Sequence, residues 1–504
     1  MMDPLTNLAM ASPMILAIGG IACFGYARFA KGRVRAWTGA LAATFFTATF
    51  LLLAAVTFIG LPSDGSTAFA VLRPNSLGLL IALLSTGLGA VACLYSQGSL
   101  DPEGPVTHFY PLIMFAIAGT VAIGFAVDLF TMFVMVELSA LPSYALVAYN
   151  FRVKKAAAAA AIKYLIQGVT GTLTALLGIS FMYIVGGTLD VDLLRTALVT
   201  APNYLLALSA MLIIVGYGVK LAIVPMHTWL PEAYYQAPTG VTAIMAGATK
   251  AGALIALFRA ISALPMSAVG AAQVGLIVSI LAIITMTVGN ILALGQKNLR
   301  RMLVYSSIAQ MGYILLGFGV GLQYSVAAGL VAGLFYLTVY GIMKGGAFLC
   351  AGAFTRATNG GKTLDELRGV GAKHPVVGVS FLLFILGLIG IPATAGFPGK
   401  LMLFQAGIAP TMINNTWANW GTLLAIALAL NSALSLGYYV PALNSVLFKA
   451  GHGDEEKGSK IPIAIVAAIV PLAAVTLILG LYPQIAMNLV EPASKLFAPG
   501  GWLP

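Results

Sequence analysis

The sequence predicts an all-α polytopic membrane protein with about 14 transmembrane helices, including two inverted five-helix repeats and two broken helices. Apolar residues make up 60% of the 504 residues and charged residues only 8%, against about 25% charged residues in soluble domains. Apolar runs long enough to cross about 30 Å of hydrocarbon recur along the chain. A soluble protein of this length would need far more polar surface, so the soluble class is excluded.

The predicted membrane segments fall into four consecutive groups. A three-helix group within residues 1–105 is followed by five-helix groups within 106–265 and 266–448, and a loop with one last helix occupies 449–504. Each segment is an apolar run between polar or charged stretches. In chain order the segments are 5–26, 36–60, 71–95, 109–127, 129–150, 162–185, 203–224, 239–261, 270–294, 302–321, 326–354, 376–406, 418–447 and 461–490.

The distribution of basic residues supports this count of helices. If successive helices alternate in direction, most of the 26 Lys and Arg residues fall in loops on one side, at 28–35, 152–155, 297–301, 356–373 and 449–460. The opposite loops hold little beyond Arg73, Arg195 and Lys495, with Arg259 near an edge. Because Lys and Arg collect in cytoplasmic loops, both termini are expected on the outer side of the membrane.

A few charged residues remain inside the apolar segments, namely Glu137, Lys163, Lys220, Lys250, Lys344 and Lys400. Each costs roughly 2.5–3.5 kcal/mol at a helix centre, so each must face protein or water and find a partner. A structural explanation, in which a lysine extends to the interface or forms a static ion pair, competes most strongly for Lys163 and Lys344. Glu137 is the only carboxylate deep in a predicted segment.

Buried lysines suit proton transfer for a physical reason. Desolvation disfavours the charged form of an amine, and a nearby carboxylate favours it again. Glu137 and Lys220 are therefore the natural candidates for a coupled pair, and Lys250 and Lys400 could pass the proton onward through water.

Two of these lysines lie beside predicted helix breaks. At the first break, Gly216 and Gly218 precede Lys220, and Pro225 follows it. At the second, Pro392 lies in a Gly-rich and Pro-rich stretch before Lys400. Proline and glycine interrupt helices, and freed backbone groups at membrane depth are tolerated only beside protein or a water-filled cavity. Broken helices at matching places in two halves indicate an inverted-repeat transporter.

The remaining titratable residues give weaker indications. His227 follows Pro225 and could take up protons near neutral pH, or it could simply cap the broken helix. The four histidines and three cysteines show no metal-ligand spacing, so we expect no cofactor in this chain. No basic stretch carries interleaved aromatics, which excludes nucleic acid as a partner.

Several short motifs follow one another in a fixed order between about residues 105 and 445. They are Met135-Val-Glu137-Leu-Ser-Ala-Leu-Pro-Ser-Tyr, Ile162-Lys-Tyr-Leu-Ile-Gln-Gly, Lys220-Leu-Ala-Ile-Val-Pro-Met-His-Thr-Trp-Leu-Pro-Glu-Ala, Ala237-Pro-Thr-Gly-Val-Thr-Ala, Ala248-Thr-Lys250-Ala-Gly, Asn298-Leu-Arg-Arg-Met-Leu-Val-Tyr-Ser-Ser-Ile and Gly396-Phe-Pro-Gly-Lys400. The set resembles the antiporter-like proton-translocating subunits of respiratory complex I, membrane-bound hydrogenases and Mrp-type cation/proton antiporters.

The resemblance implies a water-filled half-channel in each repeat. It implies that Glu137 pairs with Lys220, that Lys250 is the central relay and that Lys400 is the outlet. A lysine at position 400 resembles N-type and L-type complex I subunits, since M-type subunits usually carry glutamate there. Tyr340 and Gln310 stand where family members often have histidine, and Gln310 is closer to the Mrp D-type and hydrogenase branch.

We therefore expect a proton-translocating subunit of a complex I-like, redox-driven pump in a prokaryotic plasma membrane. The expected partners are other antiporter-like and small membrane subunits, a peripheral redox arm with iron–sulfur subunits that is quinone-, methanophenazine- or ferredoxin-linked or hydrogenase-related, and membrane lipid. One alternative is a subunit of an Mrp-type cation/proton antiporter without redox chemistry. A self-contained transporter of an organic solute is a weaker alternative, because only the buried lysines and Glu137 offer a charged substrate site.

Overall fold

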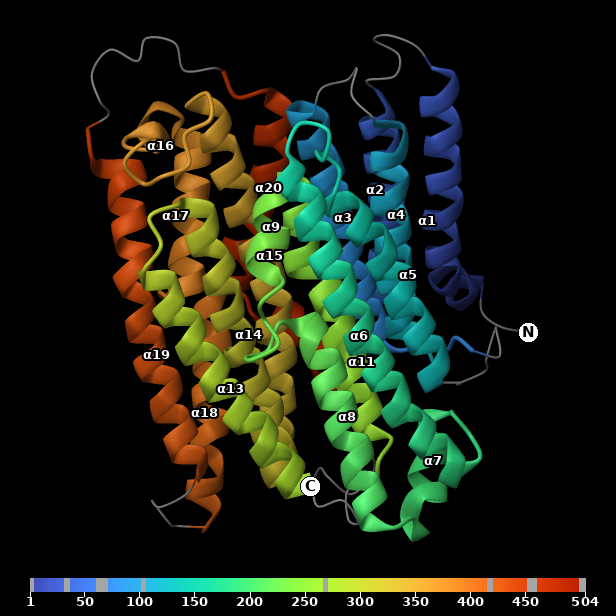
Figure 1. The fold of residues 1–504 in the computed structure, drawn as a ribbon. Coiled ribbons are helices and arrows are strands. Elements are labelled where there is room, and N and C mark those ends of the chain that lie inside the picture. The colour runs from blue at the N-terminus through green and yellow to red at the C-terminus, as the bar shows by residue number, and fades with distance from the viewer. Residues whose placement is uncertain are drawn as a thin grey trace.

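The computed structural model describes residues 4–30, 37–59, 71–100, 106–265, 271–414, 420–450 and 460–497. These parts of the chain form helices joined by short connections, and they contain isolated β-bridges but no strand. The helices stand side by side in one elongated bundle, with α1 and α19 near its opposite edges (Figure 1).

The first half of the bundle contains one interrupted helix and one helix with a π-helical turn. Its elements are α1 (Pro4–Phe29), α2 (Thr38–Ile59), α3 (Ser76–Ser99), α4 (Val106–Phe125), α5 (Leu129–Val147), α6 (Lys155–Gly186), α7 (Val191–Ala197), α8 (Asn203–Leu221), α9 (Leu230–Gln236), α10 (Thr239–Ile244), the π-helix Met245–Thr249 and α11 (Lys250–Ser262).

The second half repeats the pattern of long helices with one interruption. Its elements are α13 (Ala271–Leu294), α14 (Leu299–Tyr324), α15 (Ala327–Ala357), α16 (Val370–Lys373), α17 (Pro375–Ile389), α18 (Gly396–Asn414), α19 (Trp420–Leu443), the π-helix Asn444–Phe448, α20 (Ile463–Leu481) and α21 (Gln484–Ser494).

The predicted fold class is confirmed. Among the described residues, 13 helices are long and apolar enough to cross a membrane. The predicted segment 376–406 is divided into α17 and α18 by a break at 390–395. The predicted boundaries near residues 105 and 265 adjoin stretches outside the described ranges, so the division into 1–105, 106–265, 266–448 and 449–504 stays a prediction.

The last predicted segment, 461–490, is wrong as a single helix. The structure ends α20 at Leu481 and begins α21 at Gln484. Polar residues recur along α21 at Gln484, Asn488 and Glu491, which is the spacing of an amphipathic surface helix. The hydropathy of the apolar run hid this change of direction.

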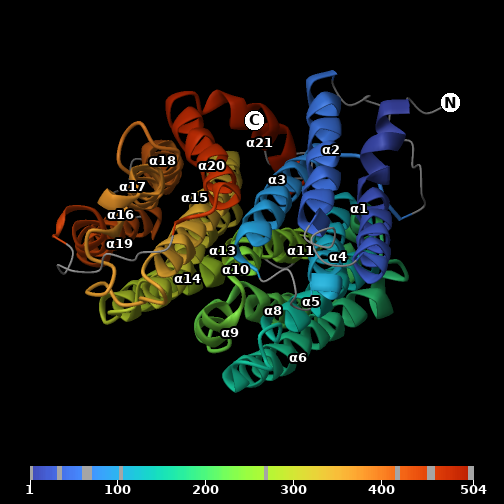
Figure 2. The same ribbon diagram turned by 90° about the horizontal axis from the view of Figure 1, so that it is seen from above.

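Two interior spans form the centre of the bundle. In the strongest membrane window of each, 94% of residues are buried for Thr239–Ser262 and for Leu299–Tyr324, against 33% for α2 and 39% for α6. Figure 2 shows α11 from above in the middle of the bundle, among other helices. Lys250 and Arg259, the charged residues of the first span, therefore lie in protein and not in lipid.

Basic loops meet at one end of the bundle. The backbone N–H of Leu299 donates to the carbonyl of Lys362 at 3.0 Å, and that of Leu364 donates to Lys297 at 2.9 Å. Partial burial lowers the pKa of Lys154, and the nearby charges of Lys362 and Arg300 lower it further. Three of the predicted basic loops therefore lie together, near α16 in Figure 1.

Two arginines on the opposite side hold the end of the described chain. Arg195 and Arg259 each donate a hydrogen bond to the carbonyl oxygen of Leu496 at 3.2 Å. Arg195 also donates to the carbonyl oxygen of Ser262 at 2.6 Å. Arg195 and Arg259 are among the basic residues that do not belong to the five basic loops. Their hydrogen bonds connect the residues after α21 to α7 and α11.

Close contact between α6 and α8 gives a testable expectation. A Cβ atom on Gly216 would lie 2.4 Å from the backbone nitrogen of Ala175 and 2.6 Å from the oxygen of Gly171. We expect Gly216→Ala to lower the free energy of unfolding by about 1–3 kcal/mol through overpacking. Thermal denaturation in detergent checks this against Gly25→Ala, whose Cβ meets nothing within 4 Å. Equal melting temperatures for the two variants would contradict the expectation.

Candidate functional site

The first helix break directs Lys220 into the protein. Helix α8 ends at Leu221, and Ala222 adopts the left-handed conformation with φ 57°. The indole N–H of Trp229 donates to the carbonyl oxygen of Val219 at 2.7 Å. This bond satisfies one of the carbonyls that a helix end leaves free, so the break is stable at this depth with Lys220 in the last turn of α8.

Glu137 and Lys220 come together in the structure. The Nζ atom of Lys220 lies 3.5 Å from Oε1 of Glu137, and it donates a hydrogen bond of 2.6 Å to the hydroxyl of Tyr144. Lys220 is buried, whereas the side chain of Glu137 is 20% exposed. Since Oε1 of Glu137 has no hydrogen bond to the described part of the chain, the pair is held by charge at a distance that a small movement would break.

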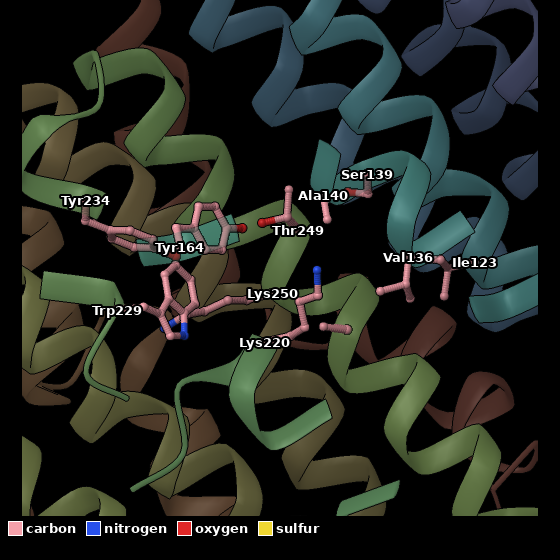
Figure 3. A pocket seen from close by; sticks show the side chains of 11 residues that line it. Ile123, Val136, Ser139, Ala140, Tyr164, Lys220, Trp229, Tyr234, Thr249 and Lys250 are labelled. Carbon is pink, nitrogen blue, oxygen red and sulfur yellow. The ribbon is translucent and has the colours of Figure 1, made fainter. Parts of the chain in front are cut away.

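A small cavity joins Lys220 to Lys250. Both lysines line it, together with polar groups that include Ser139 and Thr249, and its volume is about 20 Å³. Figure 3 shows the two lysines beside each other, with Trp229 on one side and Val136 on the other. A cavity needs about 10–15 Å³ and at least two polar partners to hold one water molecule. The site therefore has room for a single bridging water.

Lys250 occupies the centre of the bundle. It is the first residue of α11 and directly follows the π-helical turn Met245–Thr249; such turns often mark functional positions. Its Nζ atom makes no hydrogen bond to any described residue and lies 5.5 Å from the ring centre of Tyr234. Lys250 is therefore a buried amine without a hydrogen-bond acceptor among the described residues.

Lys344 continues the series on α15 and is completely buried. Its Nζ atom donates a hydrogen bond to the hydroxyl of Ser306 on α14. The rings of Phe348 and Tyr439 lie 5.8 Å from the same nitrogen. The structure therefore excludes extension of Lys344 to the membrane interface and places it within the second half of the bundle.

The second helix break supplies the environment of Lys400. Gly390 ends α17 with φ 95°, and Ala393 has φ 71°. Lys400, in the second turn of α18, donates to the carbonyl oxygens of Leu388 and Ile389 at 3.0 and 2.8 Å. These carbonyls are left free at the end of α17, and the negative end of a helix favours a cation.

Gln310 connects the surroundings of Lys344 and Lys400. Its amide donates at 3.2 Å to the carbonyl oxygen of Leu388, which also accepts from Lys400. Gln310 stands one turn after Ser306 on α14 and accepts from the hydroxyl of Tyr336 at 2.5 Å. Lys344 is thus hydrogen-bonded to Ser306, one turn before Gln310, and Lys400 shares the carbonyl oxygen of Leu388 with Gln310.

The other predicted residues lie away from this line. Lys163 forms a half-exposed ion pair with Glu232 at 3.3 Å, as its structural explanation supposed. His227 is half-buried within the first break, and its Nδ1 atom has no partner among the described residues. Pro225 and Pro392 lie exposed in their breaks. The two breaks do not match fully, because Lys220 precedes its break and Lys400 follows its own.

The four amines form a line across the bundle that we call the lysine row (Lys220, Lys250, Lys344 and Lys400). Glu137 is the carboxylate at its beginning, and no other described acidic residue forms an ion pair with a row lysine. Tyr144 and Ser306 are hydrogen-bonded to row lysines, and Gln310 shares an acceptor with Lys400. The sequence alone assigned these three residues no role in proton transfer. One feature of the sequence pointed to Gln310, because this residue stands where family members often carry histidine.

The hydroxyl of Tyr144 provides a test of how Lys220 is held. We expect Tyr144→Phe to reduce proton pumping about tenfold or more. Loss of a hydrogen bond to a charged group removes about 1.5–3 kcal/mol, and about 1.4 kcal/mol corresponds to a factor of ten in rate. Proton uptake by proteoliposomes measures the effect. The exposed Tyr183→Phe variant is the control, and equal pumping in both variants would show that the contact is dispensable.

A many-helix bundle with two interrupted helices and a row of buried lysines defines an ion-translocating membrane subunit of the antiporter-like class. Residues 126–425 match the family model described as NADH:quinone oxidoreductase/Mrp antiporter, TM. The chain belongs to this family.

Similar proteins with known names agree with that assignment. The chain is 32% identical to the F(420)H(2) dehydrogenase subunit N of Methanosarcina mazei over 474 residues, covering 92% of each chain. It is 32% identical to the NADH-quinone oxidoreductase subunit N of Mycobacterium tuberculosis, covering 95% of this chain and 91% of the relative. A chain of the Mrp complex from Dietzia shares the fold, with a TM-score of 0.84, 22% identity and 98% coverage of both chains.

No metal site accompanies the row in the part of the chain that the structure describes. No group of three or more His, Cys, Asp or Glu residues is arranged there to hold a metal ion.

Proposed function

We propose that this chain conducts protons through Glu137 and the lysine row as a membrane subunit of a complex I-like pump. The observation that carries the proposal is the continuity of the row. Each of its lysines is at most 8% exposed. Lys220 and Lys250 line one cavity. Lys344 donates to Ser306, one turn before Gln310, and Gln310 and Lys400 share the carbonyl oxygen of Leu388 as acceptor. Buried ionisable residues of this kind mark ion pathways in membrane proteins.

The pair of Glu137 and Lys220 is the proposed input. When the carboxylate is close, it stabilises the ammonium form of Lys220; when it withdraws, desolvation favours release of the proton. Because Glu137 is partly exposed at the side of the bundle, a neighbouring subunit could move it. The released proton passes through a water in the shared cavity to Lys250.

Lys344 and Lys400 are the proposed output. Lys344 receives the proton from Lys250, and Ser306 and Gln310 connect it toward Lys400. The two carbonyl oxygens at the end of α17 accept hydrogen bonds from Lys400, and the proton leaves the protein from this amine. Pro392 and Pro225 keep the breaks open, Lys163 holds α6 against α9, and His227 is a candidate for proton uptake at the first break.

Relatives named as N subunits of NADH-quinone oxidoreductase and F(420)H(2) dehydrogenase support a redox-driven complex. On this proposal the chain carries no redox centre, and a peripheral arm with iron–sulfur subunits supplies the energy. The basic loops would face the cytoplasm of a prokaryotic cell, with both termini on the outer side of its plasma membrane. Other antiporter-like and small membrane subunits would flank the chain.

The alternative is a subunit of an Mrp-type cation/proton antiporter, which the shared fold favours. Gentle purification through a tag on this chain, followed by EPR spectroscopy and identification of the co-purifying subunits, separates the two. Iron–sulfur signals with redox subunits are the expected result. Small membrane partners without such signals would overturn the redox assignment and leave the antiporter.

A further inference from the structure

A crevice of about 570 Å³ lies on the side of the bundle away from the first break. Helices α2 and α20 form its walls, and α3 and α15 form its floor. Its volume is in the range of about 300–1,000 Å³ that is usual for ligand pockets. Thr47 and Thr338 are the only polar residues in its lining, and their hydroxyls donate to Ala43 and Leu334 on their own helices. The crevice therefore suits a purely apolar ligand.

The crevice runs lengthwise between the helices, and α21 closes one of its ends. Its lining runs along α3 from Leu80 to Leu94, which is about 21 Å at the rise of an α-helix. Ile485, Ala486 and Leu489 of α21 line the closed end, and Figure 2 shows α21 between α20 and α2. A transmembrane helix of a partner must cross about 30 Å of hydrocarbon and would collide with α21. An acyl chain that enters from one leaflet would not.

Two exposed basic residues lie beyond the end of the crevice that is opposite α21. Arg356 donates to the carbonyl oxygen of Ser99, the last residue of α3, at 3.4 Å. Lys460 precedes the first turn of α20, which packs on the end of α3, because a Cβ on Gly98 would lie 3.0 Å from Ile465. Positive charge at a membrane surface attracts anionic lipid headgroups.

We propose that the crevice binds one acyl chain of an anionic phospholipid whose phosphate lies beside Arg356 and Lys460. The occupant is a lipid from the leaflet on the side of the basic loops. This site is separate from Glu137 and the lysine row.

The bound chain braces the centre of the bundle. Leu84 and Leu88 line the crevice, and they also pack against interior glycines. A Cβ atom on Gly247, in the π-helical turn before Lys250, would lie 2.4 Å from the side chain of Leu88. A Cβ atom on Gly341, three residues before Lys344, would lie 3.3 Å from that of Leu84. Occupancy of the crevice therefore supports the two turns that position these lysines.

The test uses the purified complex in phosphatidylcholine nanodiscs with phosphatidylglycerol that carries a photoreactive diazirine on one acyl chain. After illumination, peptide mass spectrometry locates the adducts. Gly87 lines the crevice, and its Cβ would make only an ordinary contact of 3.5 Å with Phe50, so Gly87→Phe extends into the crevice. Gly25→Phe is the matched control, because its Cβ meets nothing within 4 Å.

We expect adducts on the α3 and α20 peptides in the wild type and in Gly25→Phe, and an at least tenfold loss in Gly87→Phe. Gly87→Leu provides a smaller obstruction if the Phe variant fails to assemble. Lys460→Gln with Arg356→Gln should reduce labelling by phosphatidylglycerol severalfold, but not labelling by the matching photoreactive phosphatidylcholine. The readout needs no electron donor, so it is independent of the proposed proton pathway.

Two results would overturn the proposal. One is undiminished labelling of α3 and α20 in both Gly87 variants. The other is efficient cross-linking of a Thr47→Cys variant to a neighbouring subunit with no lipid adduct in the crevice, which would identify a protein segment as the occupant.

Discussion

Glu137→Gln and Lys220→Ala are each expected to reduce proton pumping to less than a tenth of the wild-type rate while the complex remains assembled. Each change removes one member of the only ion pair that a row lysine makes in the described structure. Without the carboxylate, nothing alternately stabilises and releases the proton on Lys220. The variants should remain folded, because Glu137 is partly exposed and the amide of glutamine preserves its shape.

Proton uptake by proteoliposomes, with electron transfer recorded in parallel, measures the loss. Asp365→Asn is the control variant, since it removes an exposed ion pair with Arg368, and such pairs contribute little. It should pump normally. Normal pumping in both Glu137→Gln and Lys220→Ala would refute the proposed input.

Lys250→Met and Lys400→Met should both abolish pumping but change stability in opposite directions. Lys250 has no hydrogen bond within the described structure, and replacing a buried polar group without partners by an apolar group of similar shape is neutral or stabilising. Lys400 satisfies two carbonyl oxygens. Its loss leaves the carbonyl oxygen of Ile389 without this donor, whereas that of Leu388 still accepts from Gln310. An unpaired buried group costs about 1–3 kcal/mol.

Thermal denaturation of the two purified variants against the wild type checks the difference. We expect an unchanged or higher melting temperature for Lys250→Met and a lower one for Lys400→Met. If Lys250→Met is the less stable of the two, its ammonium group has a partner that the proposed pathway omits, and the role of Lys250 as an unrestrained relay fails.

The sequence predicted the elements that hydropathy and charge determine. Long apolar runs specify membrane helices, and a charged residue within such a run is visible without a structure. Glu137 and the lysines of the row were therefore found in advance. The two helix breaks were also predicted, because proline and glycine act on the local backbone.

Contacts between helices could not be predicted in the same way. Tyr144, Ser306 and Gln310 are ordinary polar residues in sequence. Only the folded bundle brings Tyr144 to Lys220, Ser306 to Lys344, and Gln310 to the carbonyl oxygen that Lys400 shares. Backbone atoms such as the carbonyl of Leu388 have no sequence signature at all. From the sequence, Lys163 and Lys344 had the same alternative explanation, an interfacial or ion-paired lysine. In the structure Lys163 pairs with Glu232 near the surface, whereas Lys344 is completely buried.

The bonds from Arg195 and Arg259 to Leu496 have a consequence for biogenesis. Arg195 and Leu496 are 301 residues apart, and synthesis at about 5–20 residues per second separates their appearance by about 15–60 s. During that time the ends of α7 and α11 must remain in the bilayer without their final partner. The first half of the bundle is therefore completed only by a residue synthesised 301 positions after Arg195.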